Sequence, residues 1–329
     1  MYHKGQLTEI KRRLSAEAER CMNGEISRYF YKCKHTDEYG DTDENYSARE
    51  RLLYALRFGA AKIGEPQREQ LVRQLFEQEI ISREKSSFQG IGANLELLAV
   101  LMEQYRKPED EPLYERAKNA NYDCYCGFET DESYAEQYPE DIYKYNIEDS
   151  IELAHELDMT DIVCELVDRY KAEGLDGDRI FVFSWFSKFT GRADDEEIAV
   201  KGCYARAFEG DDPYNRSVMR QLSAAKRMIE WLCAHGDAKG AATLFIKHTD
   251  ILRTANGRAF FEEALNIMKA DNALIGSIWA HTSGFFAKDI KENTFYPVCY
   301  GVAKNCAELA GDEKTASIIT YLEKMKDKR

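Results

Sequence analysis

The feature that most constrains this chain is one short turn that occurs twice. The stretches "LCAHGDAKGAATLF" (Leu232 to Phe245) and "AELAGDEKTASII" (Ala307 to Ile319) both contain Gly, then Asp, then Ala four residues after the Asp. Gly readily adopts the left-handed conformation that ends a helix, and the following Asp can cap the next helix. Each stretch therefore predicts a helix, a tight reversal and a second helix. Because the two helices must cross closely there, we expect Ala241 and Ala316 to be buried.

Apolar residues flank both turns at spacings of three, four and seven, which is typical of amphipathic helices. Similar patterns surround five further turn signals, near residues 64, 109, 158, 193 and 271, so the turns recur every 35 to 49 residues or so. A helix pair with one apolar side cannot bury that side alone, so neighbouring pairs must stack. The sequence predicts an all-α fold, an α-solenoid of about seven antiparallel helix pairs. An irregular globular helical bundle is the alternative.

Two stretches interrupt this pattern. Lys34–Ser47 is acidic and poor in aliphatic residues, which predicts a loop, and residues 121–149 combine six tyrosines with many acids and Pro139. We therefore predict an N-terminal helical region over 1–107, an acidic Tyr-rich insert with a flanking helix over 108–150, and helical repeats over 151–329. We expect the insert to lie on one face as a loop or as short helices.

The net charge of −14 is concentrated in the middle of the chain. Residues 108–200 contain 8 Lys and Arg against 26 Asp and Glu, a net of −18. Such a segment repels nucleic acid and attracts basic partners. We expect a protein partner with a basic surface and no direct nucleic-acid binding through residues 108–200. The alternative is that the acidic face only keeps the protein soluble.

Hydropathy and cysteine usage bear on the compartment. The longest apolar-aromatic run, Ile180 to Phe186, is far too short to span a bilayer. The aromatic residues from Phe181 to Phe189 predict a fully buried helix, with a β-strand as the local alternative. The nine cysteines are odd in number and irregular in spacing, unlike the disulfide framework of a secreted domain. We expect a cytoplasmic, soluble protein that does not bind membranes.

Motifs for catalysis, cofactors and metals are incomplete throughout the chain. "GIGANL" (Gly90 to Leu95) lacks the third Gly of a dinucleotide fingerprint and predicts the start of a helix. "HELDM" lacks the second His of a zinc protease, and "DTDEN" lacks the Gly and Glu of a calcium loop. Cys124 and Cys126 are separated by one residue and have no second pair, which disfavours zinc. The sequence thus predicts no cofactor, no metal and no enzymatic activity.

Two stretches resemble known helical repeats. "AHELDMTDIVCELVDRY" and "CAHGDAKGAATLFIKHTD" resemble the turn and second helix of an ankyrin repeat, and the Gly-Asp-x-x-x-Ala spacing resembles the turn of tetratricopeptide repeats. The resemblance covers about half the chain, is generic, and leaves the choice between the two repeat types open. It implies an α-solenoid that binds other proteins.

The leading functional hypothesis is therefore a non-enzymatic scaffold or adaptor that presents an acidic surface to a protein partner. Tyrosine is enriched at protein interfaces, which favours the insert as the contact surface. Its candidate partner-binding residues are Asp131, Glu132, Tyr134, Glu136, Tyr138, Asp141, Tyr143 and Tyr145. Two alternatives stay open: an acidic inhibitor that mimics nucleic acid, and an enzyme whose residues are scattered over several repeats.

Overall fold

A computed structural model describes residues 3–60, 62–129, 134–209, 217–254, 257–292 and 294–326. The protein is mostly helical (75%), and helices that follow one another in the chain pack together. The predicted helical class is confirmed. The chain forms two compact units, Met1–Glu173 and Gly174–Arg329. Whether the regions 1–107, 108–150 and 151–329 fold as separate parts stays a prediction.

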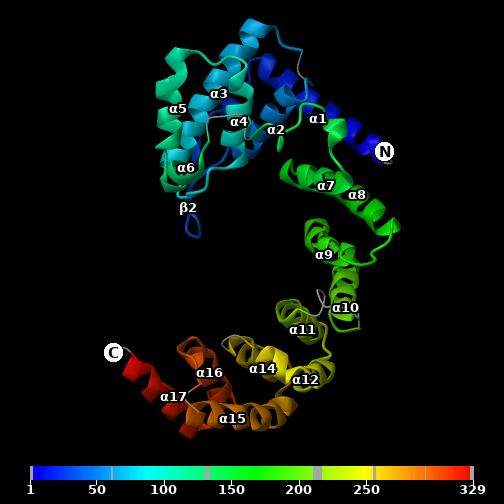
Figure 1. Ribbon diagram of the computed structural model, residues 1–329, viewed down its shortest axis with the longest axis vertical. Coiled ribbons are helices and arrows are strands. Elements are labelled where there is room, and N and C mark those ends of the chain that lie inside the picture. The colour runs from blue at the N-terminus through cyan, green and yellow to red at the C-terminus, as the bar shows by residue number, and fades with distance from the viewer. Residues whose placement is uncertain are drawn as a thin grey trace. The chain divides into compact units, whose positions relative to one another are not determined.

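The first unit contains helices, short 3-10 helices (η) and one pair of strands (Figure 1). In chain order these elements are α1 (Lys4–Met22), η1 (Ile26–Tyr29), β1 (Cys33–Thr36), β2 (Gly40–Asp43), α2 (Tyr46–Arg57), α3 (Glu65–Lys85), α4 (Ala93–Glu103), η2 (Pro108–Asp110), α5 (Glu111–Lys118), α6 (Tyr122–Gly127), η4 (Ile142–Lys144), α7 (Ile147–Glu156) and α8 (Thr160–Ala172).

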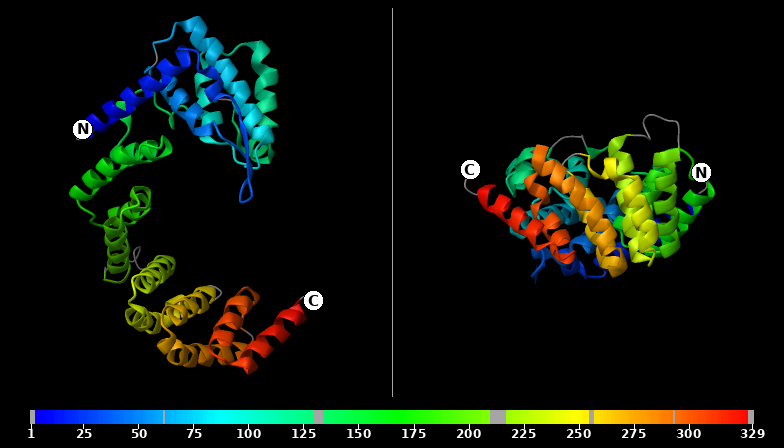
Figure 2. Two further views of the ribbon diagram at one scale, coloured as in Figure 1. Left: turned by 180° about the vertical axis from the view of Figure 1, so that it is seen from behind. Right: turned by 90° about the horizontal axis from the view of Figure 1, so that it is seen from below.

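In the described part of the second unit every element is a helix, and successive helices lie side by side (Figure 1 and Figure 2). They are α9 (Arg179–Thr190), α10 (Ala193–Glu209), α11 (Val218–Ala234), α12 (Ala238–Lys247), α13 (Thr249–Leu252), α14 (Arg258–Ala270), η5 (Asn272–Leu274), α15 (Ile275–Glu292), η6 (Pro297–Cys299), α16 (Tyr300–Leu309) and α17 (Glu313–Lys326).

The two Gly-Asp turns have the predicted geometry. Gly236 ends α11 with φ 80°, and the Asp237 carboxylate accepts a hydrogen bond from the Gly240 N–H at 2.9 Å. Gly311 follows α16 with φ 71°, and Asp312 accepts from the Thr315 N–H at 3.0 Å. Both predictions are confirmed, because a left-handed glycine and an Asp cap are properties of a few adjacent residues.

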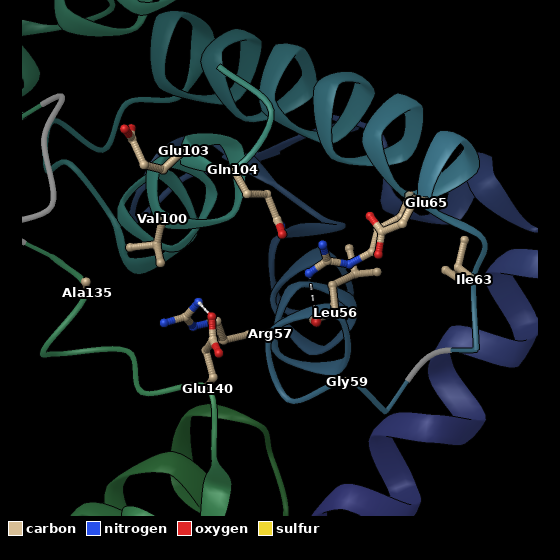
Figure 3. A pocket seen from close by; sticks show the side chains of 11 residues that line it. Leu56, Arg57, Gly59, Ile63, Glu65, Val100, Glu103, Gln104, Ala135 and Glu140 are labelled. Atoms are coloured by element: carbon tan, nitrogen blue, oxygen red, sulfur yellow. Dashed lines mark hydrogen bonds and ion pairs between the residues drawn. The ribbon is translucent and has the colours of Figure 1, made fainter. Parts of the chain in front are cut away.

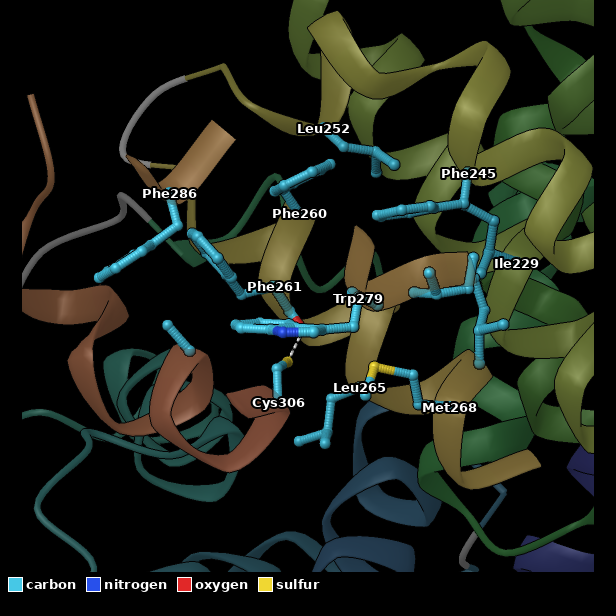
Figure 4. Close-up of a cluster of buried hydrophobic side chains, with 14 of the residues drawn as sticks. Ile229, Phe245, Leu252, Phe260, Phe261, Leu265, Met268, Trp279, Phe286 and Cys306 are labelled. Carbon is cyan, nitrogen blue, oxygen red and sulfur yellow. Dashed lines mark hydrogen bonds between the residues drawn. The ribbon is translucent and has the colours of Figure 1, made fainter. Parts of the chain in front are cut away.

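Helices α11 to α17 of the second unit share an apolar cluster (Figure 4). Phe245 on α12 stacks on Phe260 of α14, with ring centroids 4.9 Å apart, and the Cys306 thiol of α16 donates to the carbonyl of Phe261 at 3.4 Å. Ala241 is completely buried and Ala316 is 9% exposed. The predicted burial of both alanines is confirmed.

We expect Ala241→Leu to lower the free energy of unfolding by roughly 1–3 kcal/mol, because three extra carbons must fit into a filled core. Urea denaturation of the variant measures this change. Thr243 is an exposed residue of the same helix, so Thr243→Leu is the matched control and should change stability far less. Equal midpoints for Ala241→Leu and the parent would show that α12 does not pack as described.

The loop predicted over Lys34–Ser47 is wrong, since most of this stretch forms a β-hairpin and the start of α2. Strands β1 and β2 are antiparallel, with Cys33 opposite Asp43 and Thr36 opposite Gly40. Gly40 closes the turn with φ 70°, and Thr36 Oγ1 accepts from the Tyr39 N–H. The pairing depends on backbone bonds and the turn instead of an apolar face, so a search for aliphatic residues misses it.

A chain of four buried charges fixes this hairpin to the helices. Arg49 of α2 is completely buried, and its guanidinium bonds to the Asp43 carboxylate at 2.5 Å and to Glu79 of α3 at 2.8 Å. Its third bond goes to the Tyr29 carbonyl at 3.0 Å. Glu79 also pairs with Arg83, Nε to Oε1, at 3.0 Å. Opposite charges therefore alternate along the chain, which offsets much of the cost of burying them.

The structure bears on three further expectations: the buried aromatic helix, the free cysteines and the lack of a membrane span. The aromatic run forms α9, but Trp185 is 51% exposed, so the prediction of a fully buried helix is wrong. All nine cysteines are free. None of the described helices combines the length and apolar character that a membrane span requires.

Candidate functional site

The structure describes six of the eight residues predicted to bind a partner. Asp131 and Glu132 lie outside the described residues. Glu136 and Asp141 are exposed and Tyr143 is half-buried, whereas Tyr134, Tyr138 and Tyr145 are only 8%, 3% and 8% exposed. These three tyrosines are buried because their rings find packing partners within the first unit, and their role in binding a partner stays a prediction.

Three of the predicted residues hold the chain in place. Tyr134 stacks on Phe128 with centroids 6.3 Å apart, and its hydroxyl accepts from the Glu129 N–H at 3.0 Å. The Asp141 carboxylate caps η4 by accepting from the Tyr143 N–H at 3.0 Å. The hydroxyl of Tyr143 in turn lies 3.1 Å from that of Thr8 on α1. These contacts give the segment a fixed path across the unit.

The other three predicted residues, Glu136, Tyr138 and Tyr145, come together at a recess of about 500 Å³. Its floor is aromatic: Tyr54 of α2 is 3% exposed, and its ring centroid lies 6.3 Å from that of Tyr138. The Tyr138 hydroxyl donates to the Glu96 carboxylate at 2.7 Å. Burial raises the pKa of both tyrosines, so these phenols stay neutral.

The rim of this acidic recess is formed by one face of α7. Asp149, Glu152 and Glu156 follow at spacings of three and four, which places them on the same side of the helix and beside the recess. Desolvation raises the pKa of Glu152, and neighbouring Asp149 adds to the rise. Desolvation also raises the pKa of Glu156, with a further contribution from Glu152. All three side chains are nevertheless solvent-exposed, and their neighbouring carboxylates repel one another.

Compensating positive charge is scarce at the acidic recess. Lys144 is the only basic residue among those that line it. Within the described residues, none of the carboxylates of Glu136, Asp149, Glu152 and Glu156 has an ion-pair partner within 4.0 Å. The Tyr54 hydroxyl donates to Glu156 at 3.3 Å, which is a weak contact. A cation entering the recess would relieve this repulsion.

A second recess of about 590 Å³ shares the same segment but has a different balance of charge (Figure 3). Arg57 donates to the Tyr138 carbonyl at 2.7 Å and to Glu140 at 3.1 Å. Arg68 donates to the Tyr105 hydroxyl at 2.6 Å, and that hydroxyl donates to Glu65. Because its charges are already paired, this larger recess is the weaker candidate for a charged ligand.

Among the described residues, no group of three or more His, Cys, Asp or Glu side chains is arranged to hold a metal ion. Comparison with protein-family models, with curated proteins and with solved structures gives no match. The function must therefore be argued from the chemistry of this chain alone.

The acids on α7 were not among the residues predicted to bind a partner. A signal for them is present in the sequence, since the spacing of Asp149, Glu152 and Glu156 predicts one acidic helix face. Nothing in the sequence places Tyr54 opposite them, because it is 84 residues before Tyr138 and meets that residue only through tertiary packing.

Proposed function

We propose that this protein is a non-enzymatic interaction protein that binds a basic segment of a partner protein at the acidic recess. The observation that carries this proposal is a set of carboxylates that have no ion-pair partner among the described residues and that surround a floor of tyrosine rings. Carboxylates attract Lys and Arg, and the faces of aromatic rings add a cation–π attraction. A recess of about 500 Å³ has room for one or two such side chains.

The arrangement of helices supports the same proposal. Several consecutive helices pack as pairs joined by one left-handed residue: Asp158 (φ 58°) between α7 and α8, Gly191 (φ 63°) between α9 and α10, Gly236 (φ 80°) between α11 and α12, and Gly311 (φ 71°) between α16 and α17. We propose that these pairs are helical repeats of an α-solenoid, an architecture whose extended surfaces bind other proteins. The regular hairpins favour this architecture over an irregular bundle.

The proposal predicts that binding of a basic peptide depends on the acids of α7. Glu152→Gln combined with Glu156→Gln should weaken the binding of a Lys- and Arg-rich peptide by about tenfold at low salt, mainly through slower association. Isothermal titration calorimetry and stopped-flow kinetics on the full chain measure the two effects. Binding should also weaken as the pH falls, because protonation removes the negative charge, and the raised pKa values start this loss at a higher pH than for ordinary Glu.

A matched control separates the recess from overall charge. Glu109→Gln combined with Glu323→Gln changes the net charge by the same amount at exposed acids outside the recess. If both double variants lose affinity equally, the acidity acts only as a diffuse field and the recess is not the site. If free DNA or RNA competes with this protein for its natural partner, the alternative of an acidic inhibitor that mimics nucleic acid is favoured instead.

A further inference from the structure

A separate recess of about 470 Å³ lies in the first unit at the end of the buried charge chain. It is bounded by the hairpin, by α2 and α3, and by the first turn of α4. Arg83, Ser86 and Gly92 line it, with Tyr46 and Phe88 as aromatic walls. It shares no lining residue with the acidic recess.

The Arg83 side chain is held in a fixed orientation, but its two terminal nitrogens make weak hydrogen bonds. Its Nε faces Glu79 at 3.0 Å, and its guanidinium lies 5.3 Å from the Tyr46 ring centroid and 5.2 Å from that of Phe88. Within the described part of the chain, the two outer nitrogens bond only to the Gly90 carbonyl and Ser82 Oγ, both at 3.3 Å. These contacts are long for bonds from a guanidinium, which prefers about 2.7–2.9 Å to a carboxylate. The Arg83 guanidinium is therefore already positioned to bind an acceptor that comes closer than these two groups.

Ser86 provides a second and independent donor. It is 7% exposed, it lines the recess, and within the described residues its Oγ has no hydrogen-bond partner. Buried hydroxyls are nearly always hydrogen-bonded, so an unpartnered one beside a cavity indicates a missing partner, to which the hydroxyl can donate. This observation points to a ligand without reference to Arg83.

The start of α4 adds a third favourable element. Gly92 precedes the helix with φ 81°, and a Cβ there would lie 2.9 Å from Arg83 Nη1 and 3.1 Å from the Tyr46 hydroxyl. Only glycine lets the backbone pass this close to the guanidinium. The Tyr46 hydroxyl accepts from the Asn94 N–H in this first turn at 3.4 Å, a long contact, so the partial positive charge of the helix end still faces the same region.

We infer that this recess binds the carboxylate of a small organic acid with an apolar or aromatic body. Three donors of positive or partly positive character converge, which selects an anion. Asp43 lines the recess and Glu79 pairs with Arg83, so a singly charged carboxylate fits better than a doubly charged phosphate. Phe88, 57% exposed, gives the body of the acid an aromatic wall.

Ligand-observed NMR titration of the full chain tests this inference. The probes are benzoate, hexanoate, neutral benzamide and phenyl phosphate. We expect the two carboxylates to bind, benzamide to bind much more weakly, and phenyl phosphate to bind more weakly than benzoate. Ser86→Ala should weaken benzoate binding about tenfold, the typical effect of losing a hydrogen bond to a charged group. Its thermal stability should not fall, since the hydroxyl has no partner to lose.

Arg83→Lys keeps the positive charge but loses the bidentate geometry of the guanidinium. It should weaken the binding of benzoate at least as much as Ser86→Ala does. Ser277→Ala, at an exposed serine of the second unit, is the control and should bind benzoate like the parent. No saturable binding of either carboxylate up to about 10 mM overturns the inference. Unchanged affinity in Ser86→Ala, or tighter binding of phenyl phosphate than of benzoate, overturns it as well.

Discussion

Arg49→Met should lower the free energy of unfolding by about 3–5 kcal/mol, the largest effect that we expect of any single substitution in the first unit. Arg49 is completely buried and bonds to the carboxylates of Asp43 and Glu79. Removing it leaves two buried carboxylates that face each other without the shared cation. Urea denaturation followed by circular dichroism measures the loss.

The neighbouring Arg51 provides the matched control. Its side chain is 23% exposed and lies 3.3 Å from Asp158 and 4.0 Å from Glu17, so its pairs are weak. Arg51→Met should therefore cost less than about 1 kcal/mol. A loss of similar size in both variants would mean that the charge chain contributes no more than surface pairing.

Arg49→Lys distinguishes charge from geometry. An ammonium group restores one positive charge, but as a point donor it cannot reach Asp43, Glu79 and the Tyr29 carbonyl together. We expect a stability between those of the parent and Arg49→Met. This substitution also tests how the hairpin is held, because Asp43 ends β2.

The parts of the fold that the sequence predicts correctly depend on short-range chemistry. Gly236 and Asp237 end one helix and start the next by means of their own dihedral angles and one cap, so their sequence context suffices. The burial of Ala241 follows in the same way from a helical spacing measured from the turn. The start of a helix within Gly90 to Leu95 is also confirmed, at Ala93.

The parts that the sequence did not predict depend on partners far away along the chain. Tyr138 resembled an interface residue because acids surround it, but Arg57 binds its carbonyl and Glu96 accepts its hydroxyl. Local composition cannot distinguish a tyrosine that faces a partner from one that packs against residues 42 to 84 positions earlier in the chain, here Glu96 and Tyr54. The hairpin was missed for the same reason, since Asp43 is held by Arg49 of α2, which in turn pairs with Glu79 of α3.

The acidic recess and the recess beside Arg83 were also beyond what the sequence alone can predict. Their lining residues come from three or more elements each, and only the acidic face of α7 has a sequence signal of its own. Arg83 lies on a helix without a clear apolar stripe, and the nearby Gly92 suggested only a helix start. A binding site made by tertiary packing becomes visible only when burial and missing hydrogen bonds can be read for each side chain.

The pH dependence of stability should be dominated by Glu50 in the first unit. Glu50 is 6% exposed, and burial, with further repulsion from Glu156 and Glu79, raises its pKa from 4.5 to about 8. The folded state therefore keeps a proton that the unfolded state has lost between these two pH values. Stability is greatest below pH 4.5 with respect to this group and falls as the pH rises toward 8, by up to about 1.4 kcal/mol per pH unit.

Glu50→Gln removes this titration, because the amide stays neutral at every pH. The variant should match the parent near pH 4, where Glu50 is protonated in both states. It should be more stable than the parent by roughly 2–4 kcal/mol at pH 9, where the parent must bury a charge. Thermal and urea unfolding across this range measure the difference, and a gap that does not widen with pH would contradict the assignment.

Glu263 supplies an independent version of the same test in the second unit. It is completely buried on α14, where desolvation and the neighbouring Glu230 raise its pKa to about 8. Lys226 is 3.9 Å from one of its oxygens, too far for a strong bond. Glu263→Gln should stabilise the second unit at high pH with the same sign. The two acids belong to different units. If the units unfold in two steps, Glu50→Gln should shift only the midpoint of the first unit and Glu263→Gln only that of the second.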